Sequence, residues 1–502
     1  MNSKIKIGWS EIDITPEKKV ALLGQFAERI SEYVEKPLTA TAMAVSSDNA
    51  QMIIVSCDLA AVTAPLVDLV RSELEGNTAG IDPDMVIMSA IHTHTGPDFG
   101  LARRIKSKTS KSMLKELLPE GKKYVEKQNI SDNPDIIRGE EMLHYLVEKL
   151  TKVIFDAWEN RKPGSFTNAF GRAPVGMCRR ATYSDGSAQM WGETNQAVFE
   201  AIEGGSDTGI ELLYVYDENG KIKGIVPNLA CPAQCVQHRM FVSPDFWGEV
   251  KVLLRNYFGE DLYMLPLCSA AGDQCPVDLV RWVEPESDVN DPNIERRYPL
   301  KRKADPSMFD LKGMKLTGRR IANEIIAVYE DGLDPAQEDV ELVHNVHIMK
   351  LPLRRVTLAE VNAAKKAITE YLDKKTGDVD FNDAAKLQIY GGILAREELQ
   401  NVLNVVDTEV HTIRLGSIAI ATNPFELFLD YGNQIKARSH AEQTFLIQLA
   451  NGIEGYLPTE KAEKGGHYSA FIASGLVGHL GGEQLVRETL DDINNNLFPL
   501  NN

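Results

Sequence analysis

The chain has little positive charge for its size and no long apolar run. Of its 502 residues, 54 are Lys or Arg and 72 are Asp or Glu, which gives a formal net charge of −18. A surface of that sign repels phosphate backbones and anionic lipid headgroups. No stretch reaches the roughly 18 uninterrupted apolar residues of a membrane span. We therefore expect no nucleic-acid partner and no stable membrane association; the oligomeric state stays open.

Cysteine is scarce, and none of the six cysteines belongs to a Cys-x-x-Cys pair. Six cysteines in a chain of this length do not make a disulfide framework. The N-terminal segment has neither an apolar core nor a small-residue cleavage site, so it does not have the pattern of a signal peptide. Together these absences predict free thiols and a cytoplasmic protein.

Several common catalytic signatures are also missing. The sequence contains no Walker A motif, no Gly-x-Gly-x-x-Gly after a strand, no Gly-x-Ser-x-Gly and no His-Glu-x-x-His. What the chain does have is a globular composition, with 43% hydrophobic and 25% charged residues. It can therefore bury a full core, and its chemistry has to come from other motifs.

Apolar β-branched runs alternate with helical patterns, which predicts an α/β fold with a large mixed sheet. Buried strands are expected at 52–58, 85–90, 262–267 and 445–449, and hairpins at 211–229 and 410–421. Helices are expected at 65–74, after residue 426 and across 357–404. We expect one domain over 1–502, with surface insertions at 100–135 and 281–312. Polar residues cluster just after the strands, where α/β sheets usually assemble their sites.

The clearest candidate site is His92-Thr-His94, which follows the predicted strand 85–90. In an extended segment residues i and i+2 face the same side, so both imidazoles can reach one centre. Neutral imidazole is a good zinc ligand. Two buried, hydrogen-bonded histidines are an equally good interpretation of this pattern alone. The following Gly96-Pro97 favours the functional interpretation, because it lets backbone approach a ligand.

Five short motifs, taken together and in order, resemble the neutral (non-lysosomal) ceramidases. These are zinc-dependent amidases that cleave an N-acyl sphingosine. The motifs are Ile91-His-Thr-His-Thr-Gly-Pro97, Asn228-Leu-Ala-Cys-Pro-Ala-Gln234 with Val242-Ser-Pro-Asp-Phe-Trp-Gly248, Ala270-Ala-Gly-Asp-Gln-Cys-Pro276, Asn423-Pro-Phe-Glu-Leu-Phe428, and Asn451-Gly-Ile-Glu-Gly-Tyr-Leu-Pro-Thr459 with Tyr468. The resemblance covers the family's catalytic domain, and we expect its C-terminal immunoglobulin-like domain to be absent.

The resemblance implies a site residue by residue. The Zn²⁺ ligands would be His92, Cys231, Glu426 and Tyr456, with Cys231 standing where the family has a histidine. The residues that act on the substrate would be His94, Tyr468, Arg179 and Cys275. Of these, His94 and Tyr468 would donate hydrogen bonds to the carbonyl oxygen, and Arg179 would position the substrate. Cys275 replaces a serine that serves as nucleophile or substrate contact.

The residue types make chemical sense, and each has a plainer alternative. Zinc can make a bound water acidic and polarise a carbonyl. A thiolate at Cys231 would be a softer ligand, and His238 is an alternative to it or simply exposed. Cys275 is either a nucleophile or pocket lining.

Other acidic residues near the motifs also have two interpretations. Asp58 would orient a histidine or cap a helix, and Asp273 would cap a turn. Glu426 alone would also suit the first turn of a helix.

The sequence therefore predicts a zinc-dependent hydrolase that cleaves an amide or related bond of a small substrate by metal-activated water. The alternatives are an inactive ligand-binding protein, or a lyase or isomerase on the same scaffold. Basic segments at 103–108 and 296–303 would form a rim that steers an anionic substrate inward, or would be ordinary solvated loops.

Overall fold

Three sheets form the frame of the protein in a computed structural model that describes residues 3–25, 27–126, 133–137, 139–281 and 308–500. The first sheet has the order β10-β2-β6-β7-β8, the second β11-β16-β17-β19 with β20 also paired to β17, and the third β23-β24-β25-β27. Their strands are β10 (Lys162–Pro163), β2 (Lys6–Asp13), β6 (Thr39–Ser46), β7 (Gln51–Cys57), β8 (Val86–Ala90), β11 (Ser165–Arg172), β16 (Gly209–Tyr216), β17 (Ile222–Leu229), β19 (Tyr263–Met264), β20 (Leu267–Cys268), β23 (Leu342–Pro352), β24 (Val405–Leu415), β25 (Ile418–Thr422) and β27 (Gln443–Ile447).

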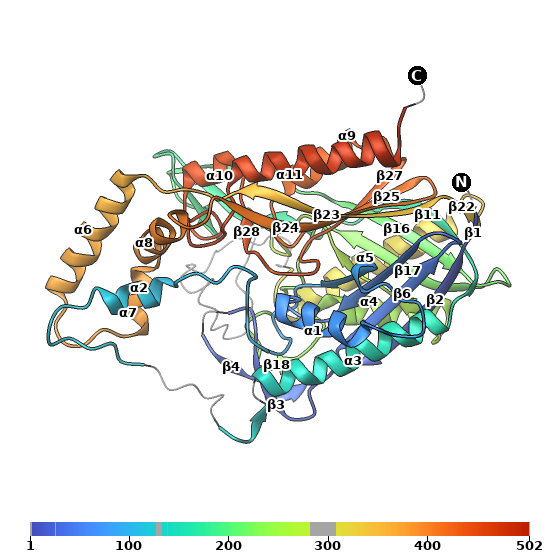
Figure 1. The fold of residues 1–502 in the computed structure, drawn as a ribbon, viewed down its shortest axis with the longest axis horizontal. Helices are drawn as coiled ribbons and strands as arrows, with labels where there is room; N and C mark the ends of the chain where they lie inside the picture. Colours follow the sequence, from blue (N-terminus) through green and yellow to red (C-terminus); the bar gives the residue numbers. More distant parts are fainter. Residues whose placement is uncertain (1–2, 26, 127–132, 138, 282–307, 501–502) are drawn as a thin grey trace.

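The sheets share one apolar core, and paired helices cover their other faces (Figure 1). Helices α1 (Ala64–Leu74) and α3 (Gly139–Glu159) pack on the first sheet. Helices α4 (Phe246–Phe258) and α5 (Asp310–Glu330) pack on the second. Helices α9 (Leu429–Arg438) and α11 (His479–Asp492) pack on the third. Each sheet is thus buried on both faces.

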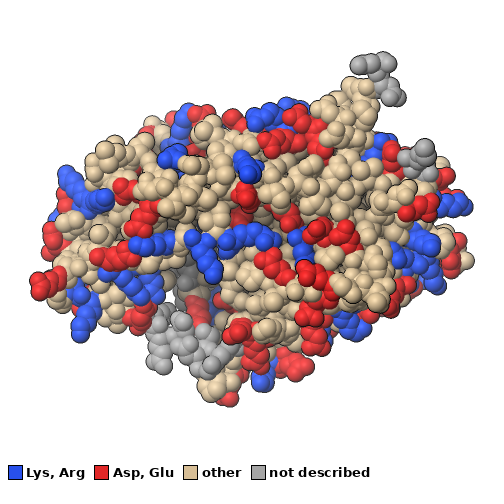
Figure 2. Space-filling model, in the orientation of Figure 1, with Lys and Arg blue, Asp and Glu red and all other residues tan. Residues whose placement is uncertain are grey.

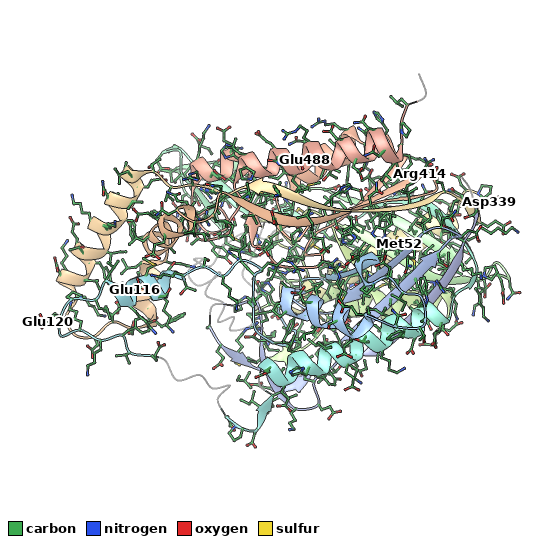
Figure 3. All side chains as sticks on the ribbon, viewed as in Figure 1. Met52, Glu116, Glu120, Asp339, Arg414 and Glu488 are labelled. Carbon is green, nitrogen blue, oxygen red and sulfur yellow. The ribbon has the colours of Figure 1, made fainter. Side chains whose placement is uncertain are left out.

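Strand β7 shows how the sequence encodes this arrangement. Met52 and Ile54 face the core shared by the sheets, whereas Ile53 and Val55 face α1 and α3. A strand buried on both faces needs a continuous apolar run and no polar alternation. Each such side chain contributes about 1.5–3 kcal/mol when fully buried. Figure 3 labels Met52 within this part of the fold.

A small helical lobe lies at one end of the molecule (Figure 1). It comprises α2 (Ser110–Glu116), α6 (Leu358–Lys374), α7 (Phe381–Lys386) and α8 (Gln388–Gln400), around an apolar cluster of its own. Glu116 and Glu120 are labelled at this end in Figure 3. The helical prediction for 357–404 is confirmed. The predicted insertion 100–135 supplies α2, and most of the other, residues 282–307, lies outside the described residues.

Most predicted elements are confirmed, including both hairpins and the strands that lead into the motifs. The strand expected at 262–267 is instead two short strands, β19 and β20, separated at Leu265-Pro266, since proline cannot donate to a sheet. Shorter elements complete the fold: β1 (Ser3–Lys4), β3 (Lys19–Leu22), β4 (Arg29–Ile30), β5 (Tyr33–Val34), β9 (Ile136–Ile137), β12 (Met177–Cys178), β13 (Arg180–Tyr183), β14 (Ala188–Met190), β15 (Phe199–Ile202), β18 (Phe241–Val242), β21 (Gln274–Cys275), β22 (Asp339–Val340), β26 (Glu426–Leu427), β28 (Tyr456–Leu457) and α10 (Glu460–Gly465).

The surface carries charged side chains of both signs. Figure 2 shows acidic and basic side chains interspersed over the face in view. Within the described ranges, no helix combines the length and the apolar character needed to cross a bilayer. All six cysteines are buried and free.

Candidate active site

The segment after β8 brings two imidazole rings together. Nε2 of His94 lies 3.4 Å from Nε2 of His92, and the ring centroids are 4.9 Å apart. An extended backbone was expected here from the sequence. The backbone instead turns, because His92 has a left-handed φ of 65°. Thr93 and Thr95 pin this turn by donating to the Ser243 carbonyl, each over 2.8 Å. The convergence was predicted correctly, but from the wrong backbone conformation.

The tautomer of His92 follows from its neighbour. Its Nδ1 lies 2.6 Å from the Ala60 carbonyl oxygen, which can only accept. Nδ1 therefore carries a proton, and Nε2 is the nitrogen that a metal could bind. Nε2 faces Oε2 of Glu426 at 3.4 Å. A carbonyl that fixes the far nitrogen of a histidine in this way is the usual support for a metal-binding imidazole.

Glu426 and Tyr456 are held side by side by the backbone. They begin β26 and β28, two short parallel strands in which Glu426 is in register with Tyr456. Glycines permit this pairing: a Cβ on Gly272 would lie 2.2 Å from the Glu426 carbonyl oxygen, and one on Gly475 would lie 2.1 Å from that of Tyr456. The two functional side chains thus leave one small, tightly packed sheet.

Burial and opposite charges set the electrostatics of this pair. Burial acts to raise the pKa of Glu426, but His92 and Arg179 hold it below its usual value. Burial raises the pKa of Tyr456 well above its usual value, and the charge of Glu426 adds to that effect. The protein alone therefore keeps Glu426 ionised and Tyr456 as a neutral phenol.

Arg179 organises the other side of the site and is 2% exposed. It donates to Oε1 of Gln234 over 3.0 Å, to the Gly272 carbonyl over 3.0 Å and to the Tyr456 hydroxyl over 3.4 Å. Because a guanidinium only donates, Gln234 must accept with its oxygen and point its NH₂ group at His94. The distance from Nε2 of Gln234 to Nε2 of His94 is 2.9 Å.

This network sets the tautomer of His94. With Gln234 donating to Nε2, that nitrogen is an acceptor and the ring proton sits on Nδ1. The hydrogen-bond donor expected of His94 from the sequence would then be its Nδ1–H, for which the described residues provide no acceptor. Burial lowers the pKa of His94 well below its usual value, helped by the nearby His92 and by Arg29 and Arg179. His94 is thus a neutral imidazole.

Tyr468 and Cys275 border the same space. The Tyr468 ring packs edge-on against Tyr456 with centroids 5.4 Å apart, and burial raises its pKa to about 12. Arg180 fixes the loop by donating to the Tyr468 carbonyl over 3.0 Å. Cys275 is fully buried, and its thiol donates to the Val277 carbonyl over 3.3 Å. Tyr468 is therefore presented to the site, and Cys275 lies in its wall.

The structure places the two candidates for a fourth metal ligand elsewhere. The Cys231 thiol contacts the Val175 carbonyl over 3.5 Å within an apolar cluster, and burial raises its pKa well above the usual value. His238 stacks on Phe309 and lies 3.6 Å from Asp310. Its side chain is only 5% exposed, so the expectation of an exposed histidine was wrong.

The two aspartates weighed in the sequence have structural roles. Asp58 accepts from the Thr39 backbone over 2.8 Å and pairs with Lys251 over 2.9 Å, so it neither orients a histidine nor caps a helix. Asp273 accepts from the backbone N–H of Leu429 at the start of α9 over 2.9 Å. It thereby ties the 270–276 motif to the segment that carries Glu426.

We tested whether these residues suit a zinc ion. Within the described part of the chain, no three His, Cys, Asp or Glu side chains form a group that could hold a metal. A zinc site therefore needs Tyr456. Ligand atoms about 2.0–2.1 Å from a tetrahedral zinc lie about 3.4 Å apart, which matches the 3.4 Å between Nε2 of His92 and Oε2 of Glu426. The spacing of this pair fits two ligands of one zinc ion, and Tyr456, in register with Glu426, supplies a further oxygen donor.

Sequence reasoning missed two residues at this site. In the sequence, Gln234 is one residue of a longer motif, and Arg103 is one of several basic residues in its segment. The Arg103 guanidinium would lie 2.5 Å from a Cβ on Gly455, the residue before Tyr456. No local pattern marks either residue, because each reaches the site through a contact across the chain.

Comparison with known proteins identifies the fold. No protein-family model and no curated protein sequence matches this chain. Among solved structures, neutral ceramidase from Pseudomonas aeruginosa has a TM-score of 0.63 at 17% identity, over 97% of this chain and 74% of that one. A ceramidase complexed with C2 has a TM-score of 0.63 at 14% identity, with the same coverage. The chain therefore has a neutral ceramidase-like fold.

Proposed function

We propose that the protein is a zinc-dependent hydrolase that cleaves an amide, or a related C–N or ester bond, of a small anionic substrate. The observation that carries this proposal is the convergence of His92, Glu426 and Tyr456, with Arg179 and His94 beside them, from segments far apart in the sequence. The fold shared with ceramidases, which are amidases, supports the same reaction class.

Zinc, when bound by His92, Glu426 and Tyr456, would polarise the scissile carbonyl and make a water molecule more acidic. We propose three protein ligands, because the Cys231 thiol contacts the Val175 carbonyl within an apolar cluster. Three ligands leave a coordination position open, as in other catalytic zinc sites.

The chain's own groups divide the remaining work. Tyr468 can donate its hydroxyl proton in a hydrogen bond to the oxygen that becomes negative in the transition state. Arg179 holds Tyr456 and Gln234 in place and adds positive charge. His94, a neutral imidazole beside His92, is proposed to donate a hydrogen bond to the substrate's carbonyl oxygen through its Nδ1–H.

Cys275 is proposed as pocket lining and not as the nucleophile. Its thiol is fully buried and already donates to the Val277 carbonyl. A nucleophilic cysteine needs access to the substrate and a stabilised thiolate. Water is then the attacking group, and the products together gain one water molecule.

The substrate is proposed to be smaller and more polar than ceramide. The site side chains are each between 6% and 9% exposed, so solvent reaches little of their surface. These residues are His92, His94, Glu426 and Tyr456. The sequence also offers no clear apolar patch for drawing a lipid from a membrane.

The test combines metal analysis with a substrate panel. The purified protein is assayed for zinc and then incubated with soluble carboxylated amides and a fluorescent short-chain ceramide, at low and high salt. Stoichiometric zinc and a mass gain of one water on soluble amides are expected. Absence of zinc after zinc-supplemented expression would indicate a binding protein, and conversion without a mass change would indicate an isomerase.

A further inference from the structure

Arg103 lies at the edge of the proposed active site, on the chain that leads from His94 toward α2. Its guanidinium packs over Gly455, where a Cβ would come within 2.5 Å of it. It donates to the Ser474 carbonyl over 3.2 Å. The backbone N–H of Tyr456 donates to that same carbonyl over 3.1 Å. Arg103 is therefore fixed one residue away from the Tyr456 backbone.

The charge of Arg103 is not neutralised by a partner. Within the described residues, no carboxylate lies within 4.0 Å of its guanidinium, and Ser474 provides its one hydrogen bond. Burial lowers the pKa of Arg103, whereas the nearby Glu454 and Glu426 carboxylates act to raise it. Glu426 belongs to the site itself, so the charge of Arg103 acts on the place where the substrate would lie.

Neighbouring arginines show that this state is specific to Arg103. Arg104 points away and pairs with Asp68 over 3.0 Å at the surface. Arg179 has its terminal nitrogens occupied by Gln234, Gly272 and Tyr456. Arg103 alone of the three combines proximity to the site with terminal N–H groups that no protein acceptor uses.

We infer that Arg103 binds a carboxylate of the substrate, so that the enzyme prefers amides that carry an acid group close to the scissile bond, such as N-acyl amino acids. A guanidinium offers two parallel N–H donors that match a carboxylate. This inference rests on the proposed function, because it places the scissile carbonyl beside His92, Glu426 and Tyr456. Arg103 would then determine specificity and take no part in bond cleavage.

The experiment compares substrates that differ only in charge. N-acetylglycine and N-acetylglycinamide, and the corresponding derivatives of larger amino acids, are assayed with wild type, Arg103→Ala, Arg103→Lys and the matched control Arg104→Ala. Wild type and Arg104→Ala should prefer the acid over the amide by about 10- to 100-fold in kcat/KM, as expected for one charge-assisted hydrogen-bonded pair. Arg103→Ala should lose this preference mainly through KM, and Arg103→Lys should keep part of it.

Binding measurements separate this inference from the proposed function. Calorimetric titration with the same acids and amides reports charge preference even where no cleavage occurs. If wild type binds the acid more tightly and Arg103→Ala does not, the inference holds although hydrolysis fails. A charge preference that is absent from wild type, or that survives in Arg103→Ala and Arg103→Lys alike, would overturn it. Circular dichroism of both variants checks that the fold is kept.

Discussion

Outside the site, Asn451 is the residue whose replacement we expect to lower the free energy of unfolding most. It is 3% exposed and has a left-handed φ of 52°. Its Oδ1 accepts from the Met88 backbone over 2.8 Å, and its Nδ2 donates to the Val86 carbonyl over 3.1 Å and to Glu409 over 2.9 Å. One side chain thus joins β8, which leads to His92, to the loop that leads to Tyr456.

The cost of Asn451→Ala can be worked from these contacts. The Met88 N–H loses its partner in a buried place, at about 1–3 kcal/mol, whereas the Val86 carbonyl keeps Nη2 of Arg71 as a donor. Alanine in the left-handed conformation, which asparagine tolerates better, adds about 1 kcal/mol. We expect the free energy of unfolding to fall by about 2–4 kcal/mol. Guanidinium denaturation followed by tryptophan fluorescence measures this change.

A second variant separates the two contributions. Asn451→Gly loses the same hydrogen bonds, but glycine adopts a left-handed φ without steric strain. It should therefore be about 1 kcal/mol more stable than Asn451→Ala. Asn219→Ala, at an exposed turn, serves as control and should stay within about 0.5 kcal/mol of wild type. A loss below about 1 kcal/mol for Asn451→Ala would refute the view that this side chain holds β8 to the loop.

Three further predictions concern the site. His92→Ala should abolish stoichiometric zinc binding and activity, whereas His344→Ala, which removes a half-buried histidine from another cluster, should keep zinc. Equal zinc content in both variants would contradict the ligand assignment. Cys275→Ser should retain measurable turnover, and complete loss with zinc still bound would establish a cysteine nucleophile. Gly24→Ala places a Cβ 2.4 Å from the His94 ring at a φ of +109°. It should destabilise the protein by about 1–3 kcal/mol in thermal or denaturant unfolding and lower kcat/KM, and an unchanged rate would show that the position of His94 is not critical.

The sequence was informative wherever burial alone determines structure. The run Met52 to Cys57 has to be a strand buried on both faces, and the position of Glu426 after an apolar hairpin placed it at a strand end. Neighbouring strand ends lie close in space, so the meeting of Glu426 with His92 could be expected. The exact pairing of Glu426 with Tyr456 needed the three-dimensional register.

What the sequence could not provide are contacts set by donor and acceptor geometry across the chain. Gln234 orients toward His94 only because Arg179 occupies its oxygen. Arg103 is one of several basic residues in its segment, and only the packing over Gly455 distinguishes it from Arg104. The backbone turn at His92 was equally hidden, since histidine has no strong preference for a left-handed φ.

The short parallel pair of β26 and β28 has a consequence for how this chain can vary in length. Successive residues of a strand point to opposite faces, so a shift of one position would turn Tyr456 away from Glu426 and bring Leu457 in its place. A single-residue insertion or deletion anywhere between these strands that moved their register would therefore destroy the site while leaving every ligand in the sequence. Insertions in the loop around Gly121, where a Cβ would meet nothing within 4 Å, face no such constraint.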